Sequence, residues 1–297
     1  RKECSYWSGR TARGYLSSQG ACGRYCDSSV EILSLGRPMQ LVVDVGNTET
    51  VVGLALSPTD IVNHWRVSSS VPRTEDEMTA LIRAFLTGDG VDENLITQGV
   101  VGSVVPSVNH VWMKTLGKIV SGDVLAVGPG SDLPIRLDVE EPMSVGADRV
   151  VNTLAAMELY HRDTIAVDLG TATTFDCITG EGVFKGGVIS PGLNAGMDWL
   201  AARTAKLPKV ELQPPGLVIG RRTDTCIQSG VFYSALDAVD GIVRRIKNEW
   251  GSPDALVVAT GGFANTIAPH LQTVDETEPF LTLYGLAMAG KHIAGAS

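Results

Sequence analysis

The stretch Val-Val-Asp-Val-Gly-Asn-Thr-Glu-Thr-Val-Val-Gly-Leu-Ala, residues 42–55, predicts an apolar β-strand, a tight polar turn and a second apolar strand. The turn holds the carboxylate of Asp44, the glycine Gly46 and three side chains that can donate hydrogen bonds. The tip of a buried hairpin seldom needs so many polar groups, so we expect an anion to bind there. A related stretch, residues 167–176, repeats the pattern as Val-Asp-Leu-Gly-Thr-Ala-Thr-Thr-Phe-Asp.

The composition is that of a globular protein, and it excludes several function classes. The chain has 297 residues, 44% of them hydrophobic and 19% charged, which is enough for two domains with cores of their own. Its net charge of −9 argues against a nucleic-acid partner held through phosphates. No apolar run reaches the roughly 18–20 residues of a membrane helix, so we expect no membrane partner. Beyond residue 38 only Cys177 and Cys226 occur, which is typical of a reducing cytoplasm.

Residues 1–38 differ from the rest of the chain. They are rich in Ser, Gly and Arg and show no sustained periodicity. We interpret them as an extension that is disordered or not native, with the native start at Met39. They contain Cys4, Cys22 and Cys26, but a fourth ligand and the usual spacing of a zinc site are missing.

From Gln40 onward the chain alternates apolar strands with amphipathic helices in two similar cycles. The first cycle contains a capping box, Thr74 to Glu77, that opens a helix. Besides the first hairpin it predicts strands at 61–67 and 124–127, a short strand within 99–106 that runs into a loop, and a second helix at 111–120. The second cycle predicts strands at 164–168, 174–178 and 255–259. It also predicts a helix that begins at 146 and further helices at 193–204, at 226–250 and around 285–291. Because the cycles match in order, we expect a duplicated α/β domain.

The two turns have the residues that a phosphate site needs. Gly46 and Gly170 allow close backbone approach, and neighbouring Asn and Thr side chains supply hydrogen-bond donors. The carboxylates of Asp44 and Asp168 would repel a phosphate unless a metal lay between them, and Mg²⁺ binds through carboxylates and substrate phosphates. Two such turns facing each other across a cleft would hold a triphosphate from both sides. The alternative is a pair of ordinary hairpins with Asx-turn and Thr-turn chemistry.

The sequence Gly146-Ala147-Asp148-Arg149 follows a proline-containing loop and opens a helix, so its amides favour an anion. An arginine can hold a substrate carboxylate through two parallel hydrogen bonds, and an aspartate can accept a hydroxyl proton. This pairing predicts a general base beside an anion site. The alternative is a helix-capping Asp148 paired with Arg149 on the surface.

From Met39 to about Gly290 the chain resembles the type III pantothenate kinase family, also called Bvg accessory factor. The resemblance rests on seven motifs in this order: Asp44–Thr48, Gly146–Arg149, Asp168–Thr171, Gly186–Gly192, Arg203–Pro208, Ile219–Gly230 and Thr260–Gly262. It implies two duplicated ribonuclease-H-like domains with an interdomain cleft, the fold of actin-like ATPases and of acetate and sugar kinases. We expect these domains at residues 39–147 and 148–297.

The resemblance also implies an activity, ATP-dependent phosphorylation of the primary hydroxyl of pantothenate to 4'-phosphopantothenate, the first step of coenzyme A biosynthesis. It implies a cytoplasmic homodimer with pantothenate bound near the dimer interface. Asp148 would be the general base. Pantothenate would contact Gly146, Ala147, Asp148 and Arg149, together with Thr204 from the partner subunit.

The cofactors implied by the resemblance are ATP, Mg²⁺ and a monovalent cation, K⁺ or NH₄⁺. Asp44 would bind Mg²⁺, and Asp168 would hold the monovalent cation. The implied contacts with ATP and its phosphates are Asp44, Gly46, Asn47, Thr48, Thr171, Thr260, Gly261 and Gly262.

One departure from the family pattern concerns the substrate. Members often carry a Tyr and an Asn-Pro ahead of the Gly-x-Asp-Arg motif, where this chain has Val139 and Glu141-Pro142. A pantothenate contact is therefore lost or replaced. Two other functions stay open on the residues alone: a non-catalytic nucleotide-binding regulator, and a kinase for a different small alcohol. The intact Asp44, Asp148 and Asp168 favour an enzyme over a regulator.

Overall fold

The computed structural model describes residues 36–295. The chain divides into two units, Arg1–Gly36 and Arg37–Ser297, and the fold below is that of the second unit. The interpretation of the N-terminal extension, including Cys4, Cys22 and Cys26, therefore falls almost entirely outside the described residues. Within them, no helix is long and apolar enough to cross a membrane.

The first sheet contains five strands in the order β3-β2-β1-β4-β5. Strand β1 pairs antiparallel with β2 and parallel with β4, and the outer strands β3 and β5 continue these two directions. Valine and leucine dominate β1 and β2, so burial on the sheet faces drives their formation. The strands are β1 (Met39–Val45), β2 (Glu49–Ser57), β3 (Asp60–Ser68), β4 (Ile96–Ser103) and β5 (Val124–Val127).

The second sheet has the order β11-β10-β7-β8-β9-β6. Its strands β9-β8-β7-β10-β11 repeat the order and the directions of the first sheet, with β6 added beside β9. This repetition confirms the predicted duplicated α/β fold. The strands are β6 (Arg136–Leu137), β7 (Thr164–Leu169), β8 (Ala172–Ile178), β9 (Val183–Pro191), β10 (Leu256–Thr260) and β11 (Glu276–Thr277).

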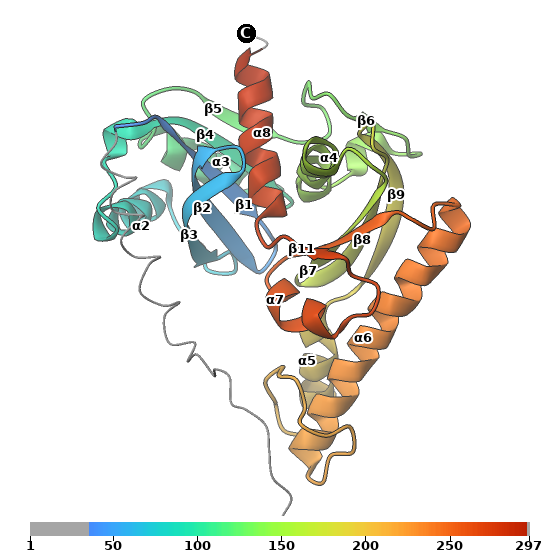
Figure 1. The fold of residues 1–297 in the computed structure, drawn as a ribbon. Helices are drawn as coiled ribbons and strands as arrows, with labels where there is room; N and C mark the ends of the chain where they lie inside the picture. The colour runs from blue at the N-terminus through green and yellow to red at the C-terminus, as the bar shows by residue number, and fades with distance from the viewer. Residues whose placement is uncertain (1–35, 296–297) are drawn as a thin grey trace, which may run out of the picture. The chain divides into compact units, whose positions relative to one another are not determined.

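Helices α2 (Glu75–Gly88) and α3 (Pro106–Gly117) pack against each other beside the first sheet (Figure 1). The predicted capping box at Thr74 is confirmed. The Glu77 amide donates to the Thr74 hydroxyl oxygen, and the Thr74 amide donates to the Glu77 carboxylate. The predicted helix at 111–120 is wrong at both ends, because α3 begins at Pro106 and ends at Gly117. Proline is favoured as the first helical residue, since an amide hydrogen there would have no partner within the helix.

Helices α4 (Ala147–Tyr160) and α8 (Leu281–Gly295) pack against each other between the sheets, and α8 also contacts β1 and β4. One hydrophobic core includes residues of both helices and of both sheets, among them Val42 and Val100 of the first and Ala166 and Val258 of the second. Figure 1 shows α8 running alongside β1 and β4, with α4 on its other side. The first and second halves therefore share a core around this helix pair.

The opposite face of the second sheet is covered by α6 (Thr223–Trp250) and α7 (Ala264–Ile267), with α5 (Leu193–Arg203) beside α6. Alternate residues of β7 divide between the two cores: Ala166 faces α4, while Ile165 and Val167 face α6. Three short 3₁₀ turns, Glu93–Leu95, Pro142–Ser144 and Ala268–His270, complete the elements. The division of the body at residues 147 and 148 stays a prediction; β6 pairs within the second sheet although it precedes that boundary.

The contact between α4 and α8 depends on a glycine. A Cβ added at Gly285 would lie 2.1 Å from the carbonyl oxygen of Val151. We therefore expect Gly285→Ala to push the helices apart and to lower the free energy of unfolding by roughly 1–3 kcal/mol, measured by urea denaturation. Gly88→Ala is the matched control, because a Cβ at the end of α2 would meet nothing within 4 Å. Equal effects of the two substitutions would contradict this account.

Candidate active site

The two polar turns occupy equivalent positions in the two sheets and touch each other. Asp44 pairs with Gly102 of β4, and Asp168 pairs with Thr260 of β10, in the same register near the ends of β1 and β7. The hydroxyl of Thr171 donates to the hydroxyl oxygen of Thr48 over 3.0 Å, joining the turns. The structure therefore brings together two stretches that lie far apart in the sequence.

Each turn is closed by a backbone hydrogen bond from its glycine. The Gly46 amide donates to the Glu49 carbonyl and the Gly170 amide to the Ala172 carbonyl, both over 3.1 Å. A Cβ at Gly46 would lie 2.8 Å from the Glu49 oxygen, so the turn requires glycine. Asn47, Thr48 and Thr171 stay exposed, and the Asn47 amide and the Thr48 hydroxyl can donate to a ligand.

Helix α4 places Asp148 beside both turns. Gly146 is the N-cap, Ala147 is the first helical residue, and the Asp148 carboxylate accepts the Arg149 amide over 2.9 Å. A Cβ at Gly146 would lie 2.4 Å from that carboxylate, so glycine makes room for it. The charge of the Asp148 carboxylate also raises the pKa of both Asp44 and Asp168.

Three partly buried carboxylates thus share one small region. Burial raises the pKa of Asp44 to about 8, and the charges of Asp148 and Asp168 add to this rise. Burial also raises the pKa of Asp168 to about 7, with further contributions from Asp148 and Asp176. The pKa of Asp148 is raised by burial, against the opposing effect of the Arg149 amide and guanidinium. Such crowding of negative charge favours a bound cation.

The oxygen-rich side chains of this region suit a hard cation better than a soft one. Among residues 36–295, no group of three or more His, Cys, Asp or Glu side chains is arranged to enclose a metal alone. A cation here would therefore need further ligands. Mg²⁺ commonly has such a site, with one or two carboxylates, several waters and the phosphates of a substrate.

The loop after β10 packs directly on the second turn. Gly261 has a φ of +90°, and a Cβ there would lie 2.2 Å from the Asp168 carboxylate. Thr260 is buried, and its hydroxyl oxygen has no hydrogen-bond partner. A Cβ at Gly262 would lie 3.3 Å from the Arg66 guanidinium, which β3 contributes from the first sheet. The predicted triplet Thr260 to Gly262 therefore lies at the Asp168 turn.

Asp176 is a functional candidate that sequence reasoning missed. Its side chain is fully buried on β8, and its carboxylate accepts the Nε hydrogen of Arg149 over 2.6 Å. Burial raises the pKa of Asp176 to about 6, although the Arg149 guanidinium opposes the rise. The available signal was a charged residue inside an apolar strand, since such a charge needs a partner.

Thr204 lies apart from this region within the protomer. It follows the last residue of α5, whose N-cap Gly192 packs on the backbone of the second turn. The Thr204 hydroxyl donates to the Leu200 carbonyl over 2.8 Å and accepts the Leu207 amide over 3.3 Å. Its predicted contact with pantothenate in a partner subunit stays a prediction. Val139, which stands at a departure from the family pattern, lies beside Gly186 of β9.

The crowded carboxylates predict a pH-dependent stability for metal-free protein. Their folded-state pKa values lie above 3.8, so the stability they contribute is complete below about pH 4 and is lost as pH rises to about 8. We expect the thermal midpoint of Asp44→Asn, relative to wild type, to be higher at pH 8 than at pH 5. The measurement is a thermal melt in EDTA.

The matched control is Asp237→Asn, which removes an exposed carboxylate on α6. Its midpoint relative to wild type should change little over the same pH range. A parallel pH dependence in the two variants would contradict the origin of the effect in burial and in the neighbouring charges.

The comparisons with known proteins agree on one family. A family model described as type III pantothenate kinase matches residues 40–245. The type III pantothenate kinase of Moorella thermoacetica is 43% identical over 250 residues, which are 84% of this chain and 97% of that relative. That of Myxococcus xanthus is 40% identical over 248 residues, 84% of this chain and 96% of the relative.

Solved structures support the fold. A conserved Baf family protein from Campylobacter jejuni superposes with a TM-score of 0.54 at 16% identity, covering 86% of this chain and 99% of that one. The ethanolamine utilization protein EutJ from Carboxydothermus hydrogenoformans gives 0.50 at 16% identity, covering 89% and 98%. The sequence matches are the stronger result, because they combine high identity with nearly full coverage of the relatives. The chain therefore belongs to the type III pantothenate kinase family.

Proposed function

We propose that this protein transfers the γ-phosphoryl group of ATP to the primary hydroxyl of pantothenate and forms 4'-phosphopantothenate, the first step of coenzyme A biosynthesis. Family membership supports the reaction. The main support for the mechanism is the position of Asp148 beside the two polar turns. Its charge raises the pKa of Asp44 in the first turn and of Asp168 in the second. Phosphoryl transfer depends mainly on positioning and charge neutralisation, which this arrangement can supply.

The nucleotide would bind between the two turns. Gly46 lets the phosphates approach the backbone, and Asn47 and Thr48 have exposed donors for phosphate oxygens. The Thr171 hydroxyl, which donates to Thr48, would turn to a phosphate oxygen when the nucleotide binds. The triplet Thr260, Gly261 and Gly262 would lie towards the adenosine. The unpartnered hydroxyl of Thr260 is a free polar group for this contact or for a water that bridges to it.

Two cations would compensate the carboxylates. Asp44 would hold Mg²⁺ together with phosphate oxygens, and Asp168 would hold K⁺ or NH₄⁺. Bound there, the cations would neutralise charge that develops on the transferring phosphoryl group. The raised pKa values of the metal-free Asp44 and Asp168 fit this role, since a cation offsets the repulsion among these carboxylates.

Asp148 would accept the proton of the pantothenate hydroxyl as the new bond to phosphorus forms. Burial raises the pKa of its carboxylate, which makes the ionised form a stronger base than an exposed aspartate. The amides at Gly146 and Ala147 begin α4 and favour a negatively charged ligand. Arg149 would bind the pantothenate carboxylate, with Thr204 contributed by a partner subunit.

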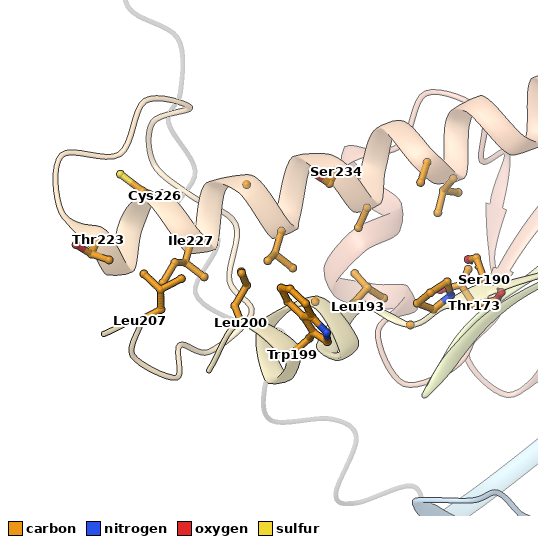
Figure 2. A pocket seen from close by; sticks show the side chains of 18 residues that line it. Thr173, Ser190, Leu193, Trp199, Leu200, Leu207, Thr223, Cys226, Ile227 and Ser234 are labelled. Carbon is orange, nitrogen blue, oxygen red and sulfur yellow. Dashed lines mark hydrogen bonds between the residues drawn. The ribbon is translucent and has the colours of Figure 1, made fainter. Parts of the chain in front are cut away.

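A homodimer would cover an apolar face near the site. Helices α5 and α6 line a cavity of about 640 Å³, with Trp199 and Leu200 facing α6 in Figure 2. Trp199 is 61% exposed, and the apolar side chains of Leu207 and Val231 line the same cavity. Exposed apolar side chains gathered in this way mark interaction surfaces.

The free thiols of Cys177 and Cys226 suit a cytoplasmic location.

We expect Asp148→Asn to lower kcat by at least roughly 100-fold, because an amide accepts no proton from the substrate hydroxyl. Nucleotide binding, followed by titration calorimetry, should stay within a few-fold of wild type. The assay measures ADP release with pantothenate, Mg²⁺ and K⁺ or NH₄⁺. Near-normal turnover of Asp148→Asn would remove this residue as the base.

The same assay with wild-type protein decides between the alternatives. Activity on another small alcohol and none on pantothenate would show that the enzyme is a kinase for that other alcohol. ATP binding without turnover of any alcohol would support a regulator. Asp237→Asn should match wild type in every arm of the assay.

We expect Trp199→Asp to convert the dimer to a monomer, because it places a charge in the apolar contact. Analytical ultracentrifugation at a concentration where wild type is dimeric measures the change. Val71→Asp is the matched control, since Val71 is a 49% exposed apolar residue outside this face. A monomeric wild type would contradict the homodimer, and a Trp199→Asp variant that stays dimeric would place the interface elsewhere.

A further inference from the structure

Arg149 is held on several sides but keeps one donor group free. Its Nε hydrogen bonds Asp176, and its guanidinium carbon lies 4.9 Å from the centre of the Phe184 ring. Only 16% of the side chain is exposed. The nitrogen Nη2 is buried and has no hydrogen-bond partner, although an unsatisfied buried donor on a charged group is costly.

Strand β9 supplies the remaining wall. A Cβ at Gly187 would lie 2.7 Å from Nη2 of Arg149 and 1.8 Å from the Phe175 carbonyl oxygen. Gly187 is also the residue that pairs with Asp176 across β8 and β9. The guanidinium therefore lies against the β9 backbone directly opposite Asp176, where any side chain would collide with it.

Asp176 keeps a free acceptor as well. Its Oδ1 receives the Nε hydrogen, while Oδ2 is buried without a partner. A side-by-side pair in which Nη2 also bonds Oδ2 would satisfy both atoms, and arginine commonly binds carboxylates in that way. Here a single bond joins the two groups, and it leaves Nη2 without a protein acceptor.

We propose that Asp176, Phe184 and Gly187 hold the Arg149 guanidinium in one orientation, so that Nη2 is presented to the carboxylate of the substrate. Asp176 is then a positioning residue that determines selectivity for an acidic alcohol over its neutral analogue. This inference rests on the proposed function, because it takes pantothenate as the ligand of Arg149. A purely structural ion pair would stabilise the fold without affecting that selectivity.

The test compares pantothenate with pantothenyl alcohol, in which a hydroxymethyl group replaces the carboxylate. If the neutral analogue is not turned over, its affinity is measured as competitive inhibition. We expect Asp176→Asn to reduce the preference for pantothenate by about 10- to 100-fold, the range expected when a charge-assisted hydrogen bond is misaligned. The loss should appear in the KM for pantothenate, with the KM for ATP within about two-fold of wild type.

Asp240→Asn is a matched control for the loss of a buried carboxylate. Asp240 lies on α6 and accepts the amides of Gln272 and Thr273, so its loss affects the fold away from Arg149. We expect this variant to melt at a lower temperature than wild type but to keep the full preference. A loss of preference in both variants would show that the effect follows from destabilisation, and would overturn the proposal.

Two further variants keep the proposal testable if Asp176→Asn does not fold. Phe184→Leu keeps an apolar side chain but removes the ring, and we expect it to lower the preference by a few-fold, in line with a cation–π contact. In an Arg149→Met background, replacing Phe184 should have no further effect on the preference. If Phe184→Leu lowered the preference by the same factor with and without Arg149, the two residues would act independently, and the proposal that Phe184 acts through Arg149 would be overturned.

The wild-type result separates this inference from the proposed function. Failure of wild type to phosphorylate pantothenate would contradict the function itself. A wild type that acts on pantothenate, with the preference unchanged in Asp176→Asn and in Phe184→Leu, would contradict only the positioning role. A wild type that treats the acid and the neutral analogue alike would also contradict it.

Discussion

The close contact between α4 and α8 is the constraint on which the rest of the structure depends. Gly285 allows α8 to lie against the backbone of Val151, and Gly102 leaves space for Leu286 of α8 beside Ala147. Helix α8 also packs on β1 and β4, so these contacts hold α4 against the first sheet. Other residues of α4 pack on the second sheet. The start of α4 is thereby held beside the ends of β1 and β7, which is why Asp148 acts on Asp44 and Asp168 alike.

The same arrangement concentrates acidic groups that a folded protein would normally keep apart. The Asp148 charge raises the pKa values of Asp44, Asp168 and Asp176 in addition to their burial, and Arg149 is the cation that pairs with Asp176. Carboxylates whose pKa values are shifted by burial and by neighbouring charges are typical of functional sites. In the proposed reaction the carboxylates near the turns would gain a cation with the substrate, whereas the Asp176 carboxylate already pairs with the Arg149 guanidinium.

Much of the fold was predictable because local chemistry and global packing agree. The hairpin around residues 42–55, the capping box at Thr74 and the duplicated order of elements all follow from residue type and periodicity. Strand β9 was missed, since Gly186 and Gly187 weaken a strand pattern and matter only through what packs on them. Asp176 was missed for a related reason: its partner lies 27 residues away, and no sequence spacing reveals such a contact.

Comparison of the two halves shows why Asp176 stands out. In the first sheet Val42 pairs with Gly53, and in the second the equivalent Ala166 pairs with Asp176. The missing side chain at Gly53 makes room for Leu283 of α8, whereas Asp176 reaches Arg149 of α4. The equivalent positions Gly53 and Asp176 therefore have different roles. Gly53 allows an apolar helix to pack closely, and Asp176 orients the side chain of Arg149. Duplication preserved the paired turns, and the divergence at this position gave only the second half a buried acid to orient an arginine.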